Sequence, residues 1–146
     1  MRTDGAKQPT TTAMPGQPIA STRPLCLVIA AVGVTMLFYL GAQPFAVGLF
    51  PEPWDKLAHL LFFSGITGLL WIGTAGHIPL ALIAIVAGIG AIDEWHQAGL
   101  PGRAMDLVDL LTDIAAALLT VIVLQAWQRR RVTQQGRQTL QTYRLM

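Results

Sequence analysis

Residues 78–127 read IPLALIAIVAGIGAIDEWHQAGLPGRAMDLVDLLTDIAAALLTVIVLQAW, two apolar segments separated by a polar stretch. The second apolar segment, residues 107–127, is close to the ~20 residues that a helix rising ~1.5 Å per residue needs to cross a ~30 Å hydrocarbon core. The first has only 15 residues without a charge, 78–92, so a spanning helix must continue through the acids to about Gln97. We therefore predict two membrane helices with carboxylates near one interface.

The composition of the whole chain agrees with a membrane protein. Of its 146 residues 53% are hydrophobic and 12% charged, and the mean hydropathy is +0.51, outside the range of soluble globular domains. Two further apolar segments, residues 25–42 and 57–75, precede the first pair. We expect an all-α integral membrane bundle of four transmembrane helices over residues 25–128. Gly76 and Pro79 predict a tight hairpin between the second and third helices.

The two ends of the chain differ from the bundle in composition. Residues 1–24 are rich in Pro, Thr, Gly and Gln and predict a flexible polar tail. This long polar lead favours an uncleaved anchor over a signal peptide for residues 25–42. Residues 129–146 form a basic C-terminal tail. Cys26 is the single cysteine, so no intramolecular disulfide can form.

The basic residues predict the orientation of the bundle. Those at the chain ends are Arg2, Lys7, Arg23, Arg129, Arg130, Arg131, Arg137 and Arg144. The positive-inside rule places both termini in the cytoplasm, and we expect the chain in the cytoplasmic (inner) membrane. Only Lys56 and Arg103 remain for the external face, which receives seven of the eight acids. Topology explains the basic residues, so we expect the lipid bilayer and no nucleic acid as partner.

Polar residues from three helices should meet at the external face. Helical spacing groups Asp55 with His59, Glu94 with Gln97, and Asp106 with Asp109 and Asp113. An acid at the bilayer centre costs at least ~2.5 kcal/mol, so Asp113, about two turns inside its helix, needs a partner or a wet cavity. With so many acids around two fixed cations, we expect some carboxylates to share protons or to bind a cation. We predict one external polar pocket.

The polar residues form four short motifs, in chain order Asp55-Lys56-x-x-His59, Glu94-x-x-Gln97, Pro101-Gly102-Arg103 and Asp106-x-x-Asp109-x-x-x-Asp113. Their order and spacing resemble those of the VanZ-like membrane protein family. The resemblance covers roughly residues 25–127, with Asp113 where members often carry Asn and Ala116 where they often carry Gly. The founding member is associated with low-level resistance to teicoplanin, which acts outside the cytoplasmic membrane. The resemblance thus implies a cell-envelope compartment and a site, but no reaction.

The predicted ligand-binding residues are Asp55, Lys56, His59, Glu94, Gln97, Arg103, Asp109 and Asp113. Lys56 or His59 would bind an anionic head group, or Lys56 would simply snorkel beside a helix start at Asp55. Arg103 would clamp a phosphate or carboxylate, form a salt bridge to Asp106, Asp109 or Glu94, or do both. We interpret Asp93 and His96 as solvated interface residues and Asp106 as a helix start.

Two functions remain open for the pocket. The first is binding of a lipid-linked or peptidoglycan-related ligand, with a link to glycopeptide resistance. The alternative is a small membrane enzyme acting on an amphiphile such as a polyprenyl phosphate, with Glu94 or Asp109 as general acid/base. His59, Glu94, Asp109 and Asp113 could hold a divalent cation, but no compact motif assigns a metal site. The pattern leaves the cofactor and the oligomeric state open.

Overall fold

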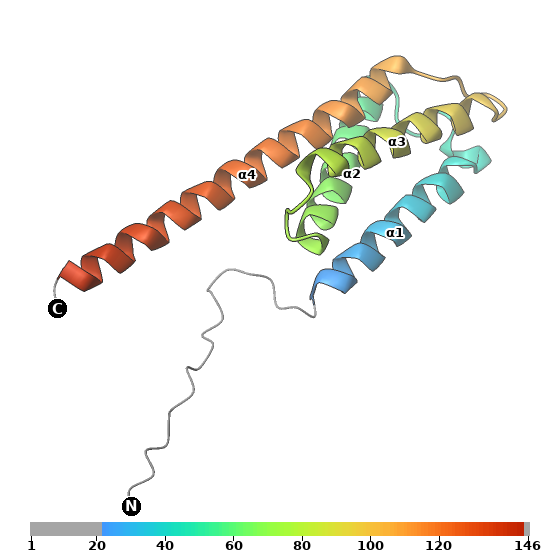
Figure 1. The fold of residues 1–146 in the computed structure, drawn as a ribbon. Helices are drawn as coiled ribbons and strands as arrows, with labels where there is room; N and C mark the ends of the chain where they lie inside the picture. The colour runs from blue at the N-terminus through green and yellow to red at the C-terminus, as the bar shows by residue number, and fades with distance from the viewer. Residues whose placement is uncertain (1–21, 145–146) are drawn as a thin grey trace, which may run out of the picture.

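The structure, a computed structural model, describes residues 22–144 and contains only helices over that range. They are α1 (Thr22–Gly41), a short 3-10 helix η1 (Pro44–Ala46), α2 (Trp54–Gly73), α3 (Pro79–Ala98) and α4 (Leu107–Arg144). Figure 1 shows them in chain order from blue to red. The predicted N-terminal tail lies outside the described residues, except that residues 22–24 begin α1.

The four long helices are each long and apolar enough to cross a membrane. Helices α1, α2 and α3 have 20 residues each, which corresponds to ~30 Å of helix. The predicted all-α bundle of four transmembrane helices is therefore confirmed, and the chain is a multi-pass membrane protein. As predicted, α3 continues through its acids, here to Ala98.

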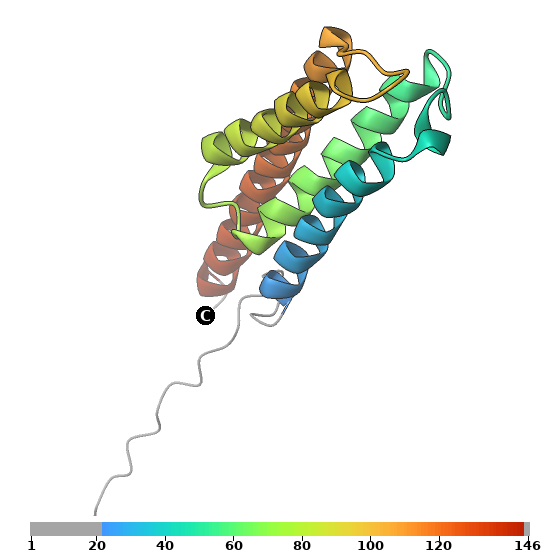
Figure 2. The same cartoon turned by 90° about the vertical axis from the view of Figure 1, so that its right-hand side faces the viewer.

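Successive helices run in opposite directions and place two loops at the same end of the bundle (Figures 1 and 2). The α1–α2 connection, residues 42–53, and the α3–α4 connection, residues 99–106, lie there; we call this the loop end. The α2–α3 turn, the start of α1 and the end of α4 lie at the opposite end. Helix α4 packs against α2 and α3, and α1 packs mainly on α2.

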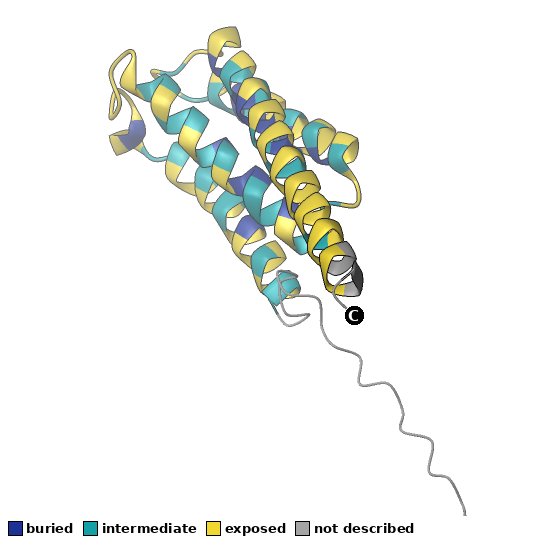
Figure 3. Cartoon of the chain, turned by 90° about the vertical axis from the view of Figure 1, so that its left-hand side faces the viewer, coloured by how far each residue is buried: buried dark blue, intermediate teal, exposed yellow. Residues whose placement is uncertain are grey.

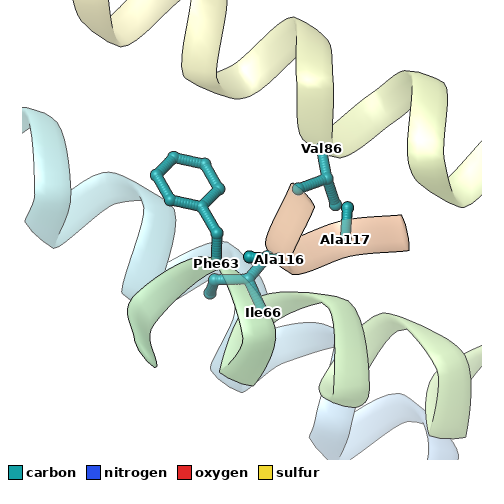
Figure 4. Close-up of a cluster of buried hydrophobic side chains, with 5 residues drawn as sticks. All are labelled: Phe63, Ile66, Val86, Ala116 and Ala117. Atoms are coloured by element: carbon teal, nitrogen blue, oxygen red, sulfur yellow. The ribbon is translucent and has the colours of Figure 1, made fainter. Parts of the chain in front are cut away.

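Small residues on α4 let three helices pack closely in the middle of the bundle. Figure 4 shows Ala116 and Ala117 of α4 against Phe63 and Ile66 of α2 and Val86 of α3, all buried. A methyl side chain fills little space, so the helix backbones can approach each other. Many large apolar residues are exposed instead, and Figure 3 colours exposed positions yellow on all four long helices. In a bilayer, lipid covers this surface.

The α2–α3 turn requires a glycine. Gly76 has φ +67°, and its N–H donates to the carbonyl of Trp71 at 2.9 Å. A Cβ at this position would come within 2.6 Å of the Trp71 ring. A left-handed, sterically crowded position of this kind favours glycine. The predicted tight hairpin between the second and third helices is confirmed, and it brings α3 back beside α2.

Candidate functional site

Three helix ends bring polar side chains together at the loop end. We call this group the polar cluster: Asp55, Lys56, His59, Asp93, Glu94, Gln97, Asp106, Asp109 and Asp113. Residues far apart in the chain meet there because the α1–α2 and α3–α4 connections lie at the same end. The predicted grouping of three polar helix faces is thus what the structure contains.

Lys56 of α2 lies close to three acids, its neighbour Asp55 and two at the start of α4, Asp106 and Asp109. Its Nζ is 2.9 Å from Asp55 Oδ2, 2.7 Å from Asp106 Oδ2 and 2.8 Å from Asp109 Oδ1. The side chain is 21% exposed. Three close carboxylates neutralise its charge, so Lys56 joins the start of α4 to α2 rather than projecting towards the interface as a free cation.

His59 of α2 pairs with the deepest acid of α4. Its Nδ1 is 2.9 Å from Asp113 Oδ1, and its Nε2 is 3.9 Å from Asp109 Oδ2. Asp113 is 0% exposed. The sequence predicted that an acid at this depth needs a partner or a wet cavity, and the partner is His59. Gly90 of α3 makes room for this carboxylate: a Cβ there would come within 2.7 Å of Asp113 Oδ2.

Glu94 and Asp106 tie the end of α3 to the start of α4. Glu94 is buried, and its Oε2 accepts the backbone N–H of Asp106 at 2.7 Å. Asp106 Oδ1 in turn accepts the N–H of Val108 at 2.7 Å, the bond expected of a residue that caps a helix N-terminus. The predicted role of Asp106 as a helix start is confirmed. The hydrogen bond from Lys56 lowers the pKa of the Asp106 carboxyl below its usual 3.8.

The interpretation of Asp93 as a solvated interface residue is wrong. Asp93 is 1% exposed, and its Oδ2 accepts a hydrogen bond from Gln97 Nε2 at 2.8 Å. It lies on the buried stripe of α3 that begins with Leu82, Val86 and Gly90. Successive members of this stripe are three or four residues apart, a helical spacing that is visible in the sequence and could have placed Asp93 inside the bundle. His96 is half-buried, with its ring edge-on to Phe38 at 5.5 Å between centroids.

Arg103 contacts the α1–α2 connection instead of an acid. Its guanidinium donates to the carbonyl of Ala46 in η1 at 2.9 Å. The alternative salt bridge to Asp106, Asp109 or Glu94 is not formed among the described residues. The sequence could not reveal this contact, because it depends on how the loop folds back. Arg103 therefore holds the two loops together, and it also lines the pocket beside them.

A pocket of about 580 Å³ opens beside the polar cluster, between α1, the α1–α2 connection, α2 and α3. Its polar lining comprises Asp55, His59, Asp93, Gln97, Arg103 and Asp109. Its apolar lining includes Met36, Leu37, Leu40, Phe45, Phe50 and Phe62. The lining thus combines groups that offer charge and hydrogen bonds with side chains that offer hydrocarbon contact, which suits an amphiphilic ligand.

The polar cluster contains more negative than positive charge. It has six carboxylates against one lysine and one histidine, and Asp93, Glu94, Asp109 and Asp113 are buried. Two buried oxygens, Glu94 Oε1 and Asp113 Oδ2, have no hydrogen-bond partner among residues 22–144. Several unpaired carboxylates cannot remain ionised together in a buried site, so protons or a bound cation must balance them.

One atom each from His59, Asp93 and Glu94 forms a set whose members lie within 4.8 Å of one another. The sequence suggested His59, Glu94, Asp109 and Asp113 as the candidate ligands. The structure instead pairs Asp113 with His59 and Asp109 with Lys56, while Asp93 takes their place beside His59 and Glu94. Asp109 and Asp113 therefore leave the candidate ligand set, and Asp93 enters it.

No family model, curated protein or solved structure matches this chain. The resemblance to the VanZ-like family thus rests on the order and spacing of the polar motifs. All eight predicted ligand-binding residues lie at the loop end, and five of them line the pocket: Asp55, His59, Gln97, Arg103 and Asp109. Lys56, Glu94 and Asp113 lie in the polar cluster that adjoins it.

Proposed function

We propose that this chain is a VanZ-like protein of the cell envelope that binds a lipid-linked or peptidoglycan-related ligand in the pocket at the loop end. The observation that carries the proposal is the mixed lining of the pocket. Phe45 and Phe62 are among its apolar residues, and Arg103 and Gln97 supply hydrogen-bond donors. A polyprenyl or acyl chain with an anionic head group has the same combination of apolar and polar chemistry.

The charge distribution supports an external position for this pocket. Arg23 lies at the start of α1, and Arg129, Arg130 and Arg131 lie in the part of α4 remote from the loop end. Positive charge at that end favours the cytoplasm. The loop end would then face the outside of the cytoplasmic membrane, where lipid-linked cell-wall precursors and glycopeptides act.

Filling the pocket tests the proposal. Ala58 lines the pocket on α2, and an Ala58→Phe substitution should displace a bound amphiphile. Native mass spectrometry of the protein purified in mild detergent should show about one copurified amphiphile per chain in the unaltered protein and roughly tenfold less in the variant. Leu57→Phe is the matched control because Leu57 is exposed on the outer surface of the same helix. Equal occupancy in both variants would refute pocket binding.

A link to glycopeptide resistance is tested separately in cells. Arg103→Ala removes a guanidinium that lines the pocket, and it should abolish any reduction in teicoplanin susceptibility that expression of the protein confers. Arg137→Ala, at an exposed position of α4 far from the pocket, should leave susceptibility unchanged. If expression of the unaltered protein changes no susceptibility, the proposed function is restricted to ligand binding.

Glu94 favours a small membrane enzyme as the second candidate function. Its carboxylate is 1% exposed and has one oxygen without a partner, a setting in which a carboxyl group can serve as a general acid or base. The isosteric change Glu94→Gln should then abolish turnover of a polyprenyl phosphate while the lipid still copurifies. Asp109, the other predicted acid/base residue, is a weaker candidate because Lys56 pairs with it.

A further inference from the structure

We propose that His59, Asp93 and Glu94 bind a divalent transition metal ion, with Zn²⁺ the best fit, and that Asp113 positions His59 for it. The three ligand side chains come from two adjacent helices, α2 and α3. Their ligand atoms lie within 4.8 Å of one another. Ligands at ~2.0–2.1 Å around a tetrahedral ion are about 3.4 Å apart, so small side-chain rotations complete the site.

The contact between His59 and Asp113 prepares the imidazole for metal binding. When Nδ1 carries the proton, it donates to Asp113 Oδ1 over the observed 2.9 Å. Nε2 is then unprotonated and can act as the metal ligand; the Asp109 carboxylate lies 3.9 Å from it. A carboxylate behind the metal-binding histidine fixes the tautomer and the ring orientation in many metal sites. Asp113 is 0% exposed and close to Gly90, so the pair is held in one place.

Buried oxygens without partners provide an independent reason for a cation. Glu94 Oε1 and Asp113 Oδ2 are both inaccessible and make no hydrogen bond to any residue that the structure describes. Lys56 cannot balance them, because its ammonium group is already shared by Asp55, Asp106 and Asp109. A divalent ion between His59, Asp93 and Glu94 would supply the missing positive charge where the carboxylates are most buried.

The donor set indicates which metal binds and leaves a position for a ligand. An imidazole nitrogen with two carboxylates favours Zn²⁺ over Mg²⁺ or Ca²⁺, which prefer oxygen donors alone. Three protein ligands leave the fourth tetrahedral position open, as in catalytic zinc sites. His59 and Asp93 both line the pocket. An anionic oxygen of the pocket ligand could occupy that position; this last step rests on the proposed function.

Metal content tests the site directly. Protein purified in detergent, stripped with chelator, incubated with Zn²⁺ and desalted should retain about one Zn²⁺ per chain by elemental analysis. His59→Ala, Asp93→Asn and Glu94→Gln should each lose it. Glu52→Gln is the matched control because Glu52 is an exposed acid at the same end of the bundle. Retention by the three variants, or equal loss in the control, would overturn the proposal.

Two further measurements distinguish loss of the metal site from misfolding of a variant. Zn²⁺ should raise the melting temperature of the unaltered protein, because a ligand that binds only the folded state stabilises it, and Mg²⁺ should do so far less. Asp113→Ala should weaken Zn²⁺ affinity roughly 10- to 100-fold. Asp113→Asn keeps an acceptor for Nδ1 and should restore most of that affinity. An unchanged melting temperature together with no bound zinc would refute the site.

The metal site and ligand binding can fail independently. Chelator-stripped protein that still copurifies an amphiphile but never retains Zn²⁺ would refute the metal site and leave the proposed function standing. Stoichiometric Zn²⁺ binding without any copurified amphiphile would refute the proposed ligand binding and leave the metal site standing. If Zn²⁺ increases retention of a phosphate-bearing amphiphile over its neutral alcohol, the open position faces the pocket ligand. Equal retention of the two would exclude that step.

Discussion

Lys56 is the residue on which most charged contacts of the site converge. Its ammonium group lies within 2.9 Å of Asp55, Asp106 and Asp109, and no other lysine is present in residues 22–144. Lys56→Met removes one charge and leaves three acids facing each other. We expect a loss of about 1–3 kcal/mol in unfolding free energy, between the values of exposed and buried pairs. Reversible unfolding in mixed micelles measures it.

Glu52→Gln provides the contrast for Lys56→Met. The Glu52 carboxylate is 3.7 Å from Lys56 Nζ, and its side chain is 79% exposed. Water screens such a pair, so the loss should not exceed about 0.5 kcal/mol. A similar loss in both variants would show that Lys56 contributes through its aliphatic chain rather than its charge.

The contact between helices α3 and α4 depends on Gly90. A Cβ at Gly90 would meet Asp113 Oδ2 at 2.7 Å and Asp113 Cβ at 3.2 Å. Gly90→Ala must therefore displace either the helix or the carboxylate that His59 holds. We expect a destabilisation of about 1–3 kcal/mol, with weaker Zn²⁺ binding if the carboxylate moves.

Gly88 on the same helix allows a matched control. A Cβ at Gly88 would meet nothing within 4 Å. Gly88→Ala should be neutral or stabilise α3 by up to ~1 kcal/mol, because alanine loses less conformational freedom in a helix. Thermal unfolding of both variants in one detergent distinguishes them. Equal melting temperatures would mean that α3 and α4 have room to separate.

Asp106 makes the start of α4 sensitive to pH. Its carboxyl faces Lys56 of α2, its backbone N–H donates to Glu94 of α3, and Asp109 lies one turn further along α4. Since the Lys56 ammonium lowers the pKa of Asp106 below 3.8 in the folded protein, its stabilisation is complete above that pH. It is lost as the pH falls through the lowered value.

Comparison of the unaltered protein with Asp106→Asn isolates this charge, because asparagine can still cap the helix. The difference in melting temperature should be constant from pH 7 to about pH 5 and should shrink below about pH 4. In a Lys56→Met background the difference should largely vanish. A difference that persists unchanged at low pH would assign the effect of Asp106 to capping alone.

The sequence predicted the presence of each helix better than it predicted where the helix ends or which way a single side chain points. The continuation of α3 to about Gln97 followed from the length that a membrane span requires, and α3 ends at Ala98. Helix α4 runs to Arg144, past the apolar segment that ends at Trp127, because Gln- and Arg-rich residues without proline can continue a helix. The prediction for Asp93 was wrong because Asp93 and the neighbouring Glu94 both lie on the buried stripe of α3 that includes Gly90.

At the scale of the whole molecule, antiparallel packing brings together residues as far as 54 positions apart in the chain. That the polar motifs meet at one end could be predicted from the number and direction of the helices. The pairing of His59 with Asp113 and of Lys56 with Asp106 could not be predicted from the sequence. It depends on the rotation and depth of each helix, which small residues such as Ala116 set through packing. The contact from Arg103 to Ala46 depends on loop structure in the same way.

The orientation of the whole molecule decides whether the pocket meets cell-wall precursors or cytoplasmic ligands. The described helices carry Arg129, Arg130 and Arg131 at the end opposite the polar cluster, and moving such charge outwards is disfavoured. Two exposed positions report on the two ends: Glu52 in the α1–α2 connection and Gln134 in α4. Each can be changed to cysteine in a Cys26→Ser background, which removes the native thiol.

In whole cells, a membrane-impermeant maleimide should label the Glu52→Cys protein and should label the Gln134→Cys protein only after the membrane is permeabilised. Labelling of both after permeabilisation controls for accessibility of the thiols. The reverse pattern would place the polar cluster in the cytoplasm. The pocket and the zinc site would survive that outcome, because they depend only on internal geometry, but a cell-wall ligand on the external face would not.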